Sequence, residues 1–170
     1  SSSSQSNNTV NLFEKVLPTI SSTALASDNS TITATFSEAV FKSRSASGTG
    51  FAGNGDLEVS DFVLSMSGGV ATLGSATPTS ISKSSNAYTL GINYIGLPNG
   101  SEVITVIPAQ DAIYDNTGNK ASTTQSNNTK TFNSEKIRIA QSLEFETGYA
   151  QFLSLLKRDS DSYIAAFMYN

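Results

Sequence analysis

The segment Thr31-Ile32-Thr33-Ala34-Thr35-Phe36 alternates threonine with apolar side chains at every second position. Successive side chains of a β-strand point to opposite faces of the sheet, so the pattern places Ile32, Ala34 and Phe36 against a core and the threonines outside. A helix would instead need apolar residues three or four positions apart. The segment therefore predicts a strand with one buried face.

Similar short segments follow along the chain, each bounded by turn residues. Residues 61–66 and 70–73 flank the turn Ser67-Gly68-Gly69, apolar side chains alternate over residues 88–94, and residues 102–107 form an apolar run suited to a strand buried on both faces. No segment between residues 10 and 124 has a convincing helical periodicity. These patterns predict an all-β fold, a two-sheet β-sandwich of about seven to nine strands.

Residues 42–56 are rich in glycine and serine and predict a long loop between strands. Phe51 is the one large apolar side chain of this loop, and it either packs back on the sandwich as a lid or contacts a partner. In the second interpretation Phe51 and Tyr94 form a platform, with the turn at Asn99 beside it, that binds a glycan or a surface protein.

Composition excludes several classes of function. The chain of 170 residues has a formal net charge of −4, and its 10 lysines and arginines are scattered singly, so the basic stripe of a nucleic-acid-binding protein is missing. It contains neither histidine nor cysteine. This removes the commonest general base, the thiolate nucleophile and the usual zinc ligands, and it rules out disulfides, which fits a bacterial exported protein.

No apolar run approaches the ~20 residues that a membrane-spanning helix needs. Residues 1–9 are polar and do not have the pattern of a signal peptide, so we expect Ser1 to be an internal position of a longer protein.

A short sequence repeat organises the two ends of the chain. Ser4-Gln5-Ser6-Asn7-Asn8-Thr9-Val10 recurs as Thr124-Gln125-Ser126-Asn127-Asn128-Thr129-Lys130, 120 positions later. A period close to one domain length indicates tandem modules. We therefore predict the tail of a preceding repeat or a junction strand at residues 1–16, the sandwich at 17–132, and the start of a following module or an assembly segment at 133–170.

Five short landmarks occur in the order in which a known family has them: Ser37-Glu38-Ala39-Val40, Gly55-Asp56-Leu57-Glu58-Val59-Ser60-Asp61-Phe62, Gly68-Gly69-Val70-Ala71, Pro98-Asn99-Gly100-Ser101-Glu102 and Ala112-Ile113-Tyr114-Asp115-Asn116-Thr117-Gly118-Asn119. With them the chain resembles, over residues 17–132, a bacterial immunoglobulin-like tandem repeat of large secreted or surface proteins of the adhesin type. The resemblance implies an immunoglobulin-like sandwich that acts as a spacer or an adhesive stalk. Residues 137–145 resemble the start of a laminin-G or concanavalin-like domain, and a further repeat is an equal alternative for them.

Oxygen-bearing side chains around Gly118 suggest a site for a hard cation such as calcium, with Asp111, Asp115 and Asn119 as ligands. The alternative is a turn in which Asp115 and Asn119 bind the backbone of their own loop. A second arrangement would bring acidic side chains together at one end of the sandwich: Asp28, Glu38 and Asp61.

A catalytic pair of carboxylates is the remaining enzymatic candidate, and Asp56, Glu58 and Asp61 are the residues close enough in sequence to supply it. The surrounding sequence offers nothing that would raise the pKa of one of them selectively, so a solvated loop is the preferred interpretation. We predict a non-catalytic structural repeat of a secreted or cell-surface protein that requires no cofactor. Its partners would be neighbouring repeats or identical subunits, which strand addition could join into filaments. The alternative is an adhesive module, assisted by calcium, that binds a glycan or a surface protein.

Overall fold

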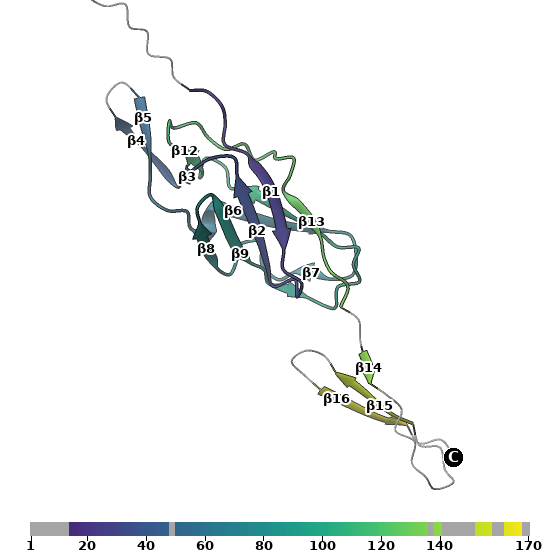
Figure 1. Cartoon of the computed structure of the whole chain (residues 1–170). Helices are drawn as coiled ribbons and strands as arrows, with labels where there is room; N and C mark the ends of the chain where they lie inside the picture. Colours follow the sequence, from purple (N-terminus) through teal and green to yellow (C-terminus); the bar gives the residue numbers. More distant parts are fainter. Residues whose placement is uncertain (1–13, 48–49, 136–137, 141–151, 158–161, 168–170) are drawn as a thin grey trace, which may run out of the picture. The chain divides into compact units, whose positions relative to one another are not determined.

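The computed structural model describes residues 14–47, 50–135, 138–140, 152–157 and 162–167 of the chain (Figure 1). It divides the chain into two compact units, Ser1–Asn133 and Ser134–Asn170. The first copy of the repeat, residues 4–10, lies outside the described residues.

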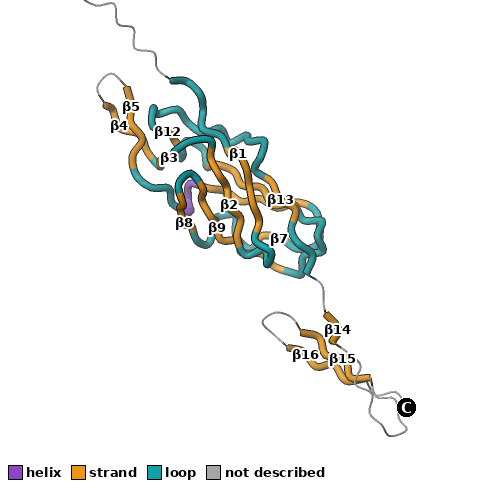
Figure 2. Tube along the Cα trace, in the orientation of Figure 1, coloured by secondary structure: helices purple, strands orange, loops and turns teal. Residues whose placement is uncertain are grey.

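Unit 1 consists of strands and loops, with one short helical turn, η1, visible in Figure 2. Its elements are β1 Ile20–Leu25, β2 Thr31–Phe36, β3 Val40–Phe41, β4 Ser43–Ser47, β5 Gly50–Asn54, η1 Val59–Asp61, β6 Phe62–Ser67, β7 Thr72–Leu73, β8 Ile81–Ser84, β9 Ala87–Gly91, β10 Tyr94–Ile95, β11 Val103–Pro108, β12 Tyr114–Asp115 and β13 Thr129–Thr131.

Two antiparallel sheets form the body of unit 1, with the strand orders β1-β2-β9-β8 and β13-β11-β6. Taken in chain order, the seven strands of these sheets have the arrangement ABED on one sheet and CFG on the other, which is the immunoglobulin constant-type order. Three pairs of short strands, β10-β7, β12-β3 and β4-β5, extend the described part of the unit. The predicted all-β immunoglobulin-like sandwich is confirmed.

An aromatic cluster joins the two sheets. Ile32, Ala34 and Phe36 are at most 2% exposed, as the alternation in this segment predicts. The Phe36 ring lies 6.3 Å from that of Phe62 on the facing sheet and 5.9 Å from that of Tyr88 on β9. The Tyr88 hydroxyl donates a hydrogen bond to the carbonyl of Val40 at 3.1 Å, so this buried polar group is satisfied.

The prediction of a long loop at residues 42–56 is wrong, because β4 and β5 form an antiparallel hairpin there. Small residues allow this hairpin to approach the sandwich closely. A Cβ atom placed on Gly53 would lie 2.1 Å from Cδ2 of Phe41, so only glycine leaves room for this ring. The Arg44 guanidinium lies over the rings of Phe51 and Tyr114, at 4.4 and 5.5 Å.

Two predicted strands differ in detail from the structure. β11 is not buried on both faces: Ile104 and Val106 are buried, whereas Val103, Thr105 and Ile107 are half-buried. The strand predicted at residues 70–73 is reduced to β7, and Val70 is 68% exposed. β11 belongs to an antiparallel sheet with one face on the core, and the residues before β7 form a turn bound by the buried Glu102 carboxylate.

The described residues of unit 2 form three antiparallel strands, β14 Arg138–Ala140, β15 Phe152–Lys157 and β16 Ser162–Phe167, in the order β14-β15-β16. β16 pairs with β15 over its whole described length, from Ser162 to Phe167. Residues 168–170 lie outside the described part. Among the described residues, no helix has the length and apolar character needed to cross a membrane.

Candidate functional site

Asp115, at the end of β12, organises the loop that follows it. Its side chain is completely buried, and its carboxylate accepts hydrogen bonds from the backbone N–H groups of Thr117 and Asn119 at 2.7 and 2.8 Å. The Thr117 hydroxyl and the Asn119 amide add two more, at 3.0 and 2.7 Å. Gly118 has φ +87°, which lets the chain turn around the carboxylate. The sequence Asp-Asn-Thr-Gly-Asn thus forms the predicted turn.

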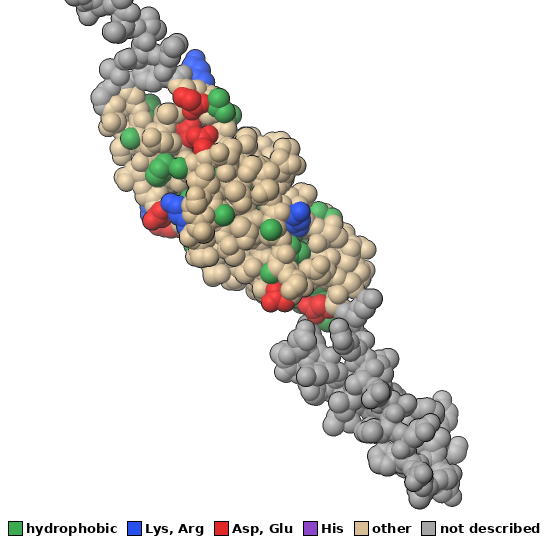
Figure 3. All heavy atoms as spheres, viewed as in Figure 1, with side chains coloured by type: hydrophobic (Ala, Val, Ile, Leu, Met, Phe, Trp, Pro, Cys, Tyr) green, Lys and Arg blue, Asp and Glu red, His purple; other side chains and the backbone are tan. Residues whose placement is uncertain are grey.

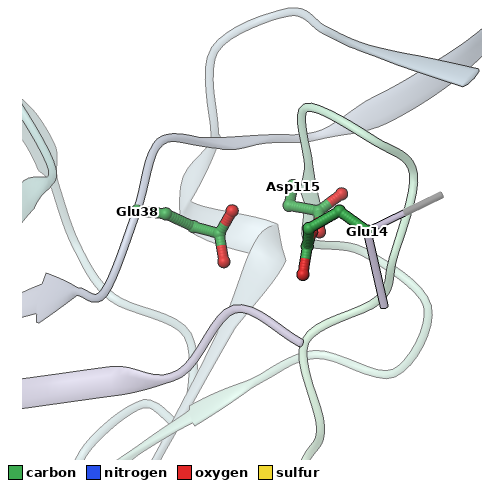
Figure 4. A group of neighbouring side chains, drawn as sticks. All are labelled: Glu14, Glu38 and Asp115. Carbon is green, nitrogen blue, oxygen red and sulfur yellow. The ribbon is translucent and has the colours of Figure 1, made fainter. Parts of the chain in front are cut away.

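Two further carboxylates converge on Asp115, as Figure 4 shows. Glu14, from the segment before β1, and Glu38, from the turn after β2, each place an oxygen within 4.8 Å of the others. The Asn119 amide also donates to the Glu14 carbonyl at 3.1 Å and to the Val16 carbonyl at 3.3 Å. The β12 loop therefore holds the segment that leads into β1, and the three acids are the described residues that could hold a hard cation.

The electrostatics of this group differ from one acid to the next. Burial raises the pKa of Glu38, and the neighbouring charges of Asp115 and Glu14 raise it further. Burial acts in the same direction on Asp115, but the hydrogen bonds from Asn119 and Thr117 outweigh it and lower the pKa of this carboxyl. The charged form of Asp115 is therefore favoured. The charged form of Glu38 is disfavoured, because it would be a third negative charge beside those of Asp115 and Glu14.

The residues predicted as cation ligands are only partly brought together. Asp115 and Asn119 meet, but the Asp111 carboxylate lies against Lys120 at 2.6 Å instead. In the described part of the chain, Glu14, Glu38 and Asp115 form the one group of three acids with adjacent ligand atoms. Asp28 instead accepts hydrogen bonds from Ser30, and Asp61 from the backbone of Glu58. Sequence reasoning missed Glu14 because it treated residues 1–16 as part of a different module.

The residues predicted to contact a partner do not form one surface. Phe51 is 47% exposed and packs on Arg44 at one end of the sandwich. Tyr94, on β10, stacks edge-on against Phe132 at 5.3 Å, and Figure 1 shows β7, the partner of β10, at the other end. Asn99 is exposed, and its side-chain oxygen accepts the N–H of Ser101 at 2.9 Å. Phe51 and Tyr94 therefore do not form a shared platform.

A second buried carboxylate, Glu102, ties together two of the landmark turns. It is completely buried, and it accepts backbone N–H groups from both turns: Val70 at 2.8 Å, Ala71 at 3.0 Å, Asn99 at 3.1 Å and Gly100 at 3.0 Å. Gly69 has φ +59°, and a Cβ atom there would lie 2.1 Å from the Glu102 carboxyl carbon. Burial by itself would raise the pKa of Glu102, but these N–H groups lower it to about 2.

The carboxylates considered for catalysis have structural partners. Asp56 pairs with Lys83 at 2.9 Å, and Glu58 pairs with Lys42. Asp61 accepts the backbone N–H of Glu58 at 2.7 Å and so caps η1. Contrary to expectation, burial raises the pKa of Asp61. The hydrogen bond that Asp61 makes at η1 nevertheless gives this residue a structural role that needs no catalytic reaction.

Comparison with protein-family models, with curated proteins and with solved structures finds no match to this chain.

The acidic group can be tested by replacing Glu38 with glutamine. Without calcium we expect Glu38→Gln to raise the melting temperature slightly at pH 7, because it removes a charge that burial, Asp115 and Glu14 all disfavour. If the group binds calcium, 10 mM calcium adds about 1–3 kcal/mol to the stability of the unsubstituted chain and much less to that of the variant.

Thermal unfolding in chelator and in calcium measures both effects. Asp111→Asn is the matched control, because Asp111 lies outside the group and its removal should leave the calcium response unchanged. A melting temperature of the unsubstituted chain that does not move between chelator and calcium would count against a cation at this group.

Proposed function

We propose that the chain is a non-catalytic structural repeat of an extracellular or cell-surface protein, of the kind found in bacterial immunoglobulin-like arrays. The observation that carries this proposal is the repeat of Gln5-Ser6-Asn7-Asn8-Thr9 at residues 125–129, one domain length later. In unit 1 the second copy is built into the sandwich and ends at its last strand, β13. A segment that ends one sandwich and recurs ahead of the same sandwich is typical of modules in series.

The surface of unit 1 supports a structural role. On the face shown in Figure 3 uncharged polar side chains and backbone predominate, and charged side chains occur in small separate groups. The buried charges of Glu102 and Asp115 are satisfied by turns, so the chain uses its interior acids to fix loops. Such internal ties resist local opening, which favours stiffness and resistance to proteases. The absence of cysteine from the sequence is compatible with bacterial export.

A second candidate function is adhesion, and one observation favours it. The β4–β5 hairpin extends from the sandwich in Figure 1 and carries Phe51, which is 47% exposed beside the Arg44 guanidinium. A half-exposed aromatic ring next to a cation can contact a sugar or a protein surface. A glycan array in which Phe51→Ser loses binding that the unsubstituted chain has would support adhesion, and an array without hits would leave the structural role.

Pulling on single molecules tests the structural proposal. We expect unit 1 to unfold in one cooperative step when the full chain is stretched from its ends, because β1 and β13 are held to the same body. The 113 residues from Ile20 to Phe132 extend to about 40 nm at ~3.5 Å per residue, so the step should add about 35 nm after the folded length is subtracted. Gradual extension at low force, without this step, would contradict a module that withstands tension.

A further inference from the structure

Residues 125–132 close the sandwich by bonding to both of its sheets. On the first sheet, the Ile20 N–H donates to the Gln125 side-chain oxygen at 2.8 Å. The Thr23 hydroxyl lies 3.1 Å from the carbonyls of Asn127 and Thr129, both of which can accept its proton. The segment therefore satisfies polar groups along β1 that would otherwise face the open edge of the sheet.

On the second sheet the same segment forms hydrogen bonds through both its backbone and its side chains. The Val106 N–H donates to the Asn128 carbonyl, and the Asn128 amide donates back to the Val106 carbonyl, both at 2.8 Å. β13 then pairs with β11, with Thr129 opposite Thr105. Phe132 follows, 2% exposed, and fills the core against Tyr94. Residues 125–132 thus occupy a groove between β1 and β11. The side chains that fix them there are those of Gln125, Asn128 and Phe132.

The first copy of the repeat preserves these features. Gln5, Asn7, Asn8 and Thr9 match Gln125, Asn127, Asn128 and Thr129, and Leu12 supplies an apolar side chain at the position of Phe132. The two copies differ at Val10 and Asn11, which correspond to Lys130 and Thr131. Lys130 and Thr131 are both exposed, so neither fixes the segment in its groove. The positions whose side chains make the contacts keep their chemical character, and the two positions at which it changes are both exposed.

The repeat also continues beyond the strand. After one additional residue in the second copy, Glu14-Lys15-Val16 corresponds to Glu135-Lys136-Ile137. The first of these leads into β1 and the second into β14, and each of these strands pairs antiparallel with the next strand along the chain. That next strand in unit 2, β15, lies 121 residues after β2, the offset of Glu135 from Glu14. Unit 2 thus begins with the same strand order as unit 1.

We propose that residues 5–12 form the closing strand of a second sandwich of this design, in the groove between β1 and β11 that residues 125–132 occupy in unit 1. The partner is a second copy of this fold, recognised through the side chains of Gln5, Asn8 and Leu12. This inference rests on the proposed function as a structural repeat, and it adds the segment and the groove by which successive sandwiches are joined.

The first test asks whether the sequence of residues 5–12 can close a sandwich. The substitutions Lys130→Val, Thr131→Asn and Phe132→Leu in the full chain make residues 125–132 identical to residues 5–12. We expect cooperative unfolding with a melting temperature lowered by about 5 °C or less, because the smaller leucine is the only change in the core. The control adds Gln125→Ala and Asn128→Ala to this graft and should lose a further ~10 °C. A graft that melts no higher than its control would overturn the proposal.

The second test asks whether residues 5–12 enter the groove of another copy, and it exploits the lack of native cysteine. One full-length chain carries Thr9→Cys. The other carries Thr105→Cys together with Asn128→Ala, which weakens its own closing strand. Because Thr105 lies opposite Thr129, the position that Thr9 matches, we expect a disulfide-linked dimer on mild oxidation.

Asn11→Cys is the register control, since it lies two residues out of step, and its dimer should form at least about tenfold more slowly. The Thr105→Cys, Thr129→Cys double variant verifies that the groove permits the bond within one chain. Equal rates for the Thr9→Cys and Asn11→Cys chains, or no dimer, would overturn the inference. The single-step unfolding of unit 1 under force would be unaffected by that result, so a failure of the inference is distinguishable from a failure of the proposed function.

Discussion

Glu102→Gln is expected to destabilise unit 1 by about 3 kcal/mol and to lower its melting temperature by about 10 °C. The carboxylate is completely buried and accepts backbone N–H groups from Val70, Ala71, Asn99 and Gly100. Glutamine has the same shape but carries an NH2 group in place of one oxygen, so a donor would face donors. Val70 and Ala71 bond to one carboxylate oxygen and Asn99 and Gly100 to the other, so the single oxygen of glutamine can serve only one of the two turns.

The same site predicts a pH dependence. Backbone N–H groups hold the pKa of Glu102 at about 2, below its ordinary value of 4.5, against the effect of burial. A carboxyl whose pKa is lower in the folded state stabilises the fold above its unfolded pKa, and this contribution is lost as the pH falls through the folded pKa. We therefore expect the Glu102 contribution to decline from about pH 4.5 to about pH 2.

Urea denaturation followed by circular dichroism at a series of pH values measures both effects. The curves of free energy against pH for the unsubstituted chain and for Glu102→Gln should be furthest apart at neutral pH and should approach each other near pH 2. Glu58→Gln is the control, because the Glu58 side chain is 61% exposed and its loss should cost less than about 1 kcal/mol. A Glu102→Gln variant as stable as Glu58→Gln at pH 7 would contradict this account of the two turns.

The fold could be predicted from sequence where a side chain's surroundings follow from its position in a strand. The alternation at Ile32, Ala34 and Phe36 is a local signal, and the structure buries all three. The hairpin at residues 42–56 has no such signal, because it pairs small and polar residues and is held by Arg44 and by a glycine that faces Phe41. A stretch rich in glycine and serine therefore predicts a loop. The residues that hold this hairpin in place are distant from it or give no strand pattern, so the sequence does not reveal its two strands.

The buried acids also show that contacts between residues distant in sequence cannot be predicted from local spacing. Asp115 and Asn119 are four residues apart, so their turn could be predicted from spacing alone. Glu14 and Glu38 reach Asp115 only because the fold brings three distant segments to one end of the sandwich. Glu102 stands in a sequence that reads as the start of an apolar strand, and its role depends on Gly69, thirty-three residues earlier. A charged residue directly before a predicted strand, together with a glycine-rich turn earlier in the chain, is a weak but usable signal for a carboxylate that binds two turns.

The second large effect is expected at Asn29, in the turn between β1 and β2. Asn29 is completely buried and has φ +59°. Its amide donates to the Asn133 carbonyl at 2.9 Å, and its side-chain oxygen accepts the Asn133 N–H at 2.8 Å. Asn29→Gly keeps the backbone conformation but removes both bonds, at a cost of about 2 kcal/mol. Asn29→Ala also places a Cβ in the left-handed region, which should bring the cost to about 3 kcal/mol.

Comparing the two variants in urea denaturation separates the hydrogen bonds from the backbone strain. Asn133→Ala serves as the control, because it keeps the backbone bonds to Asn29 and loses the longer bonds of the Asn133 amide, to Ala26 and Ser27 at 3.2 Å and to the Asn29 side-chain oxygen at 3.3 Å. If Asn29→Gly were as stable as the unsubstituted chain, the link between Asn29 and Asn133 would carry no energy. Since Asn133 is the last residue of unit 1, tension applied beyond it reaches the sandwich at this link, and Asn29→Gly should also lower the force of the unfolding step.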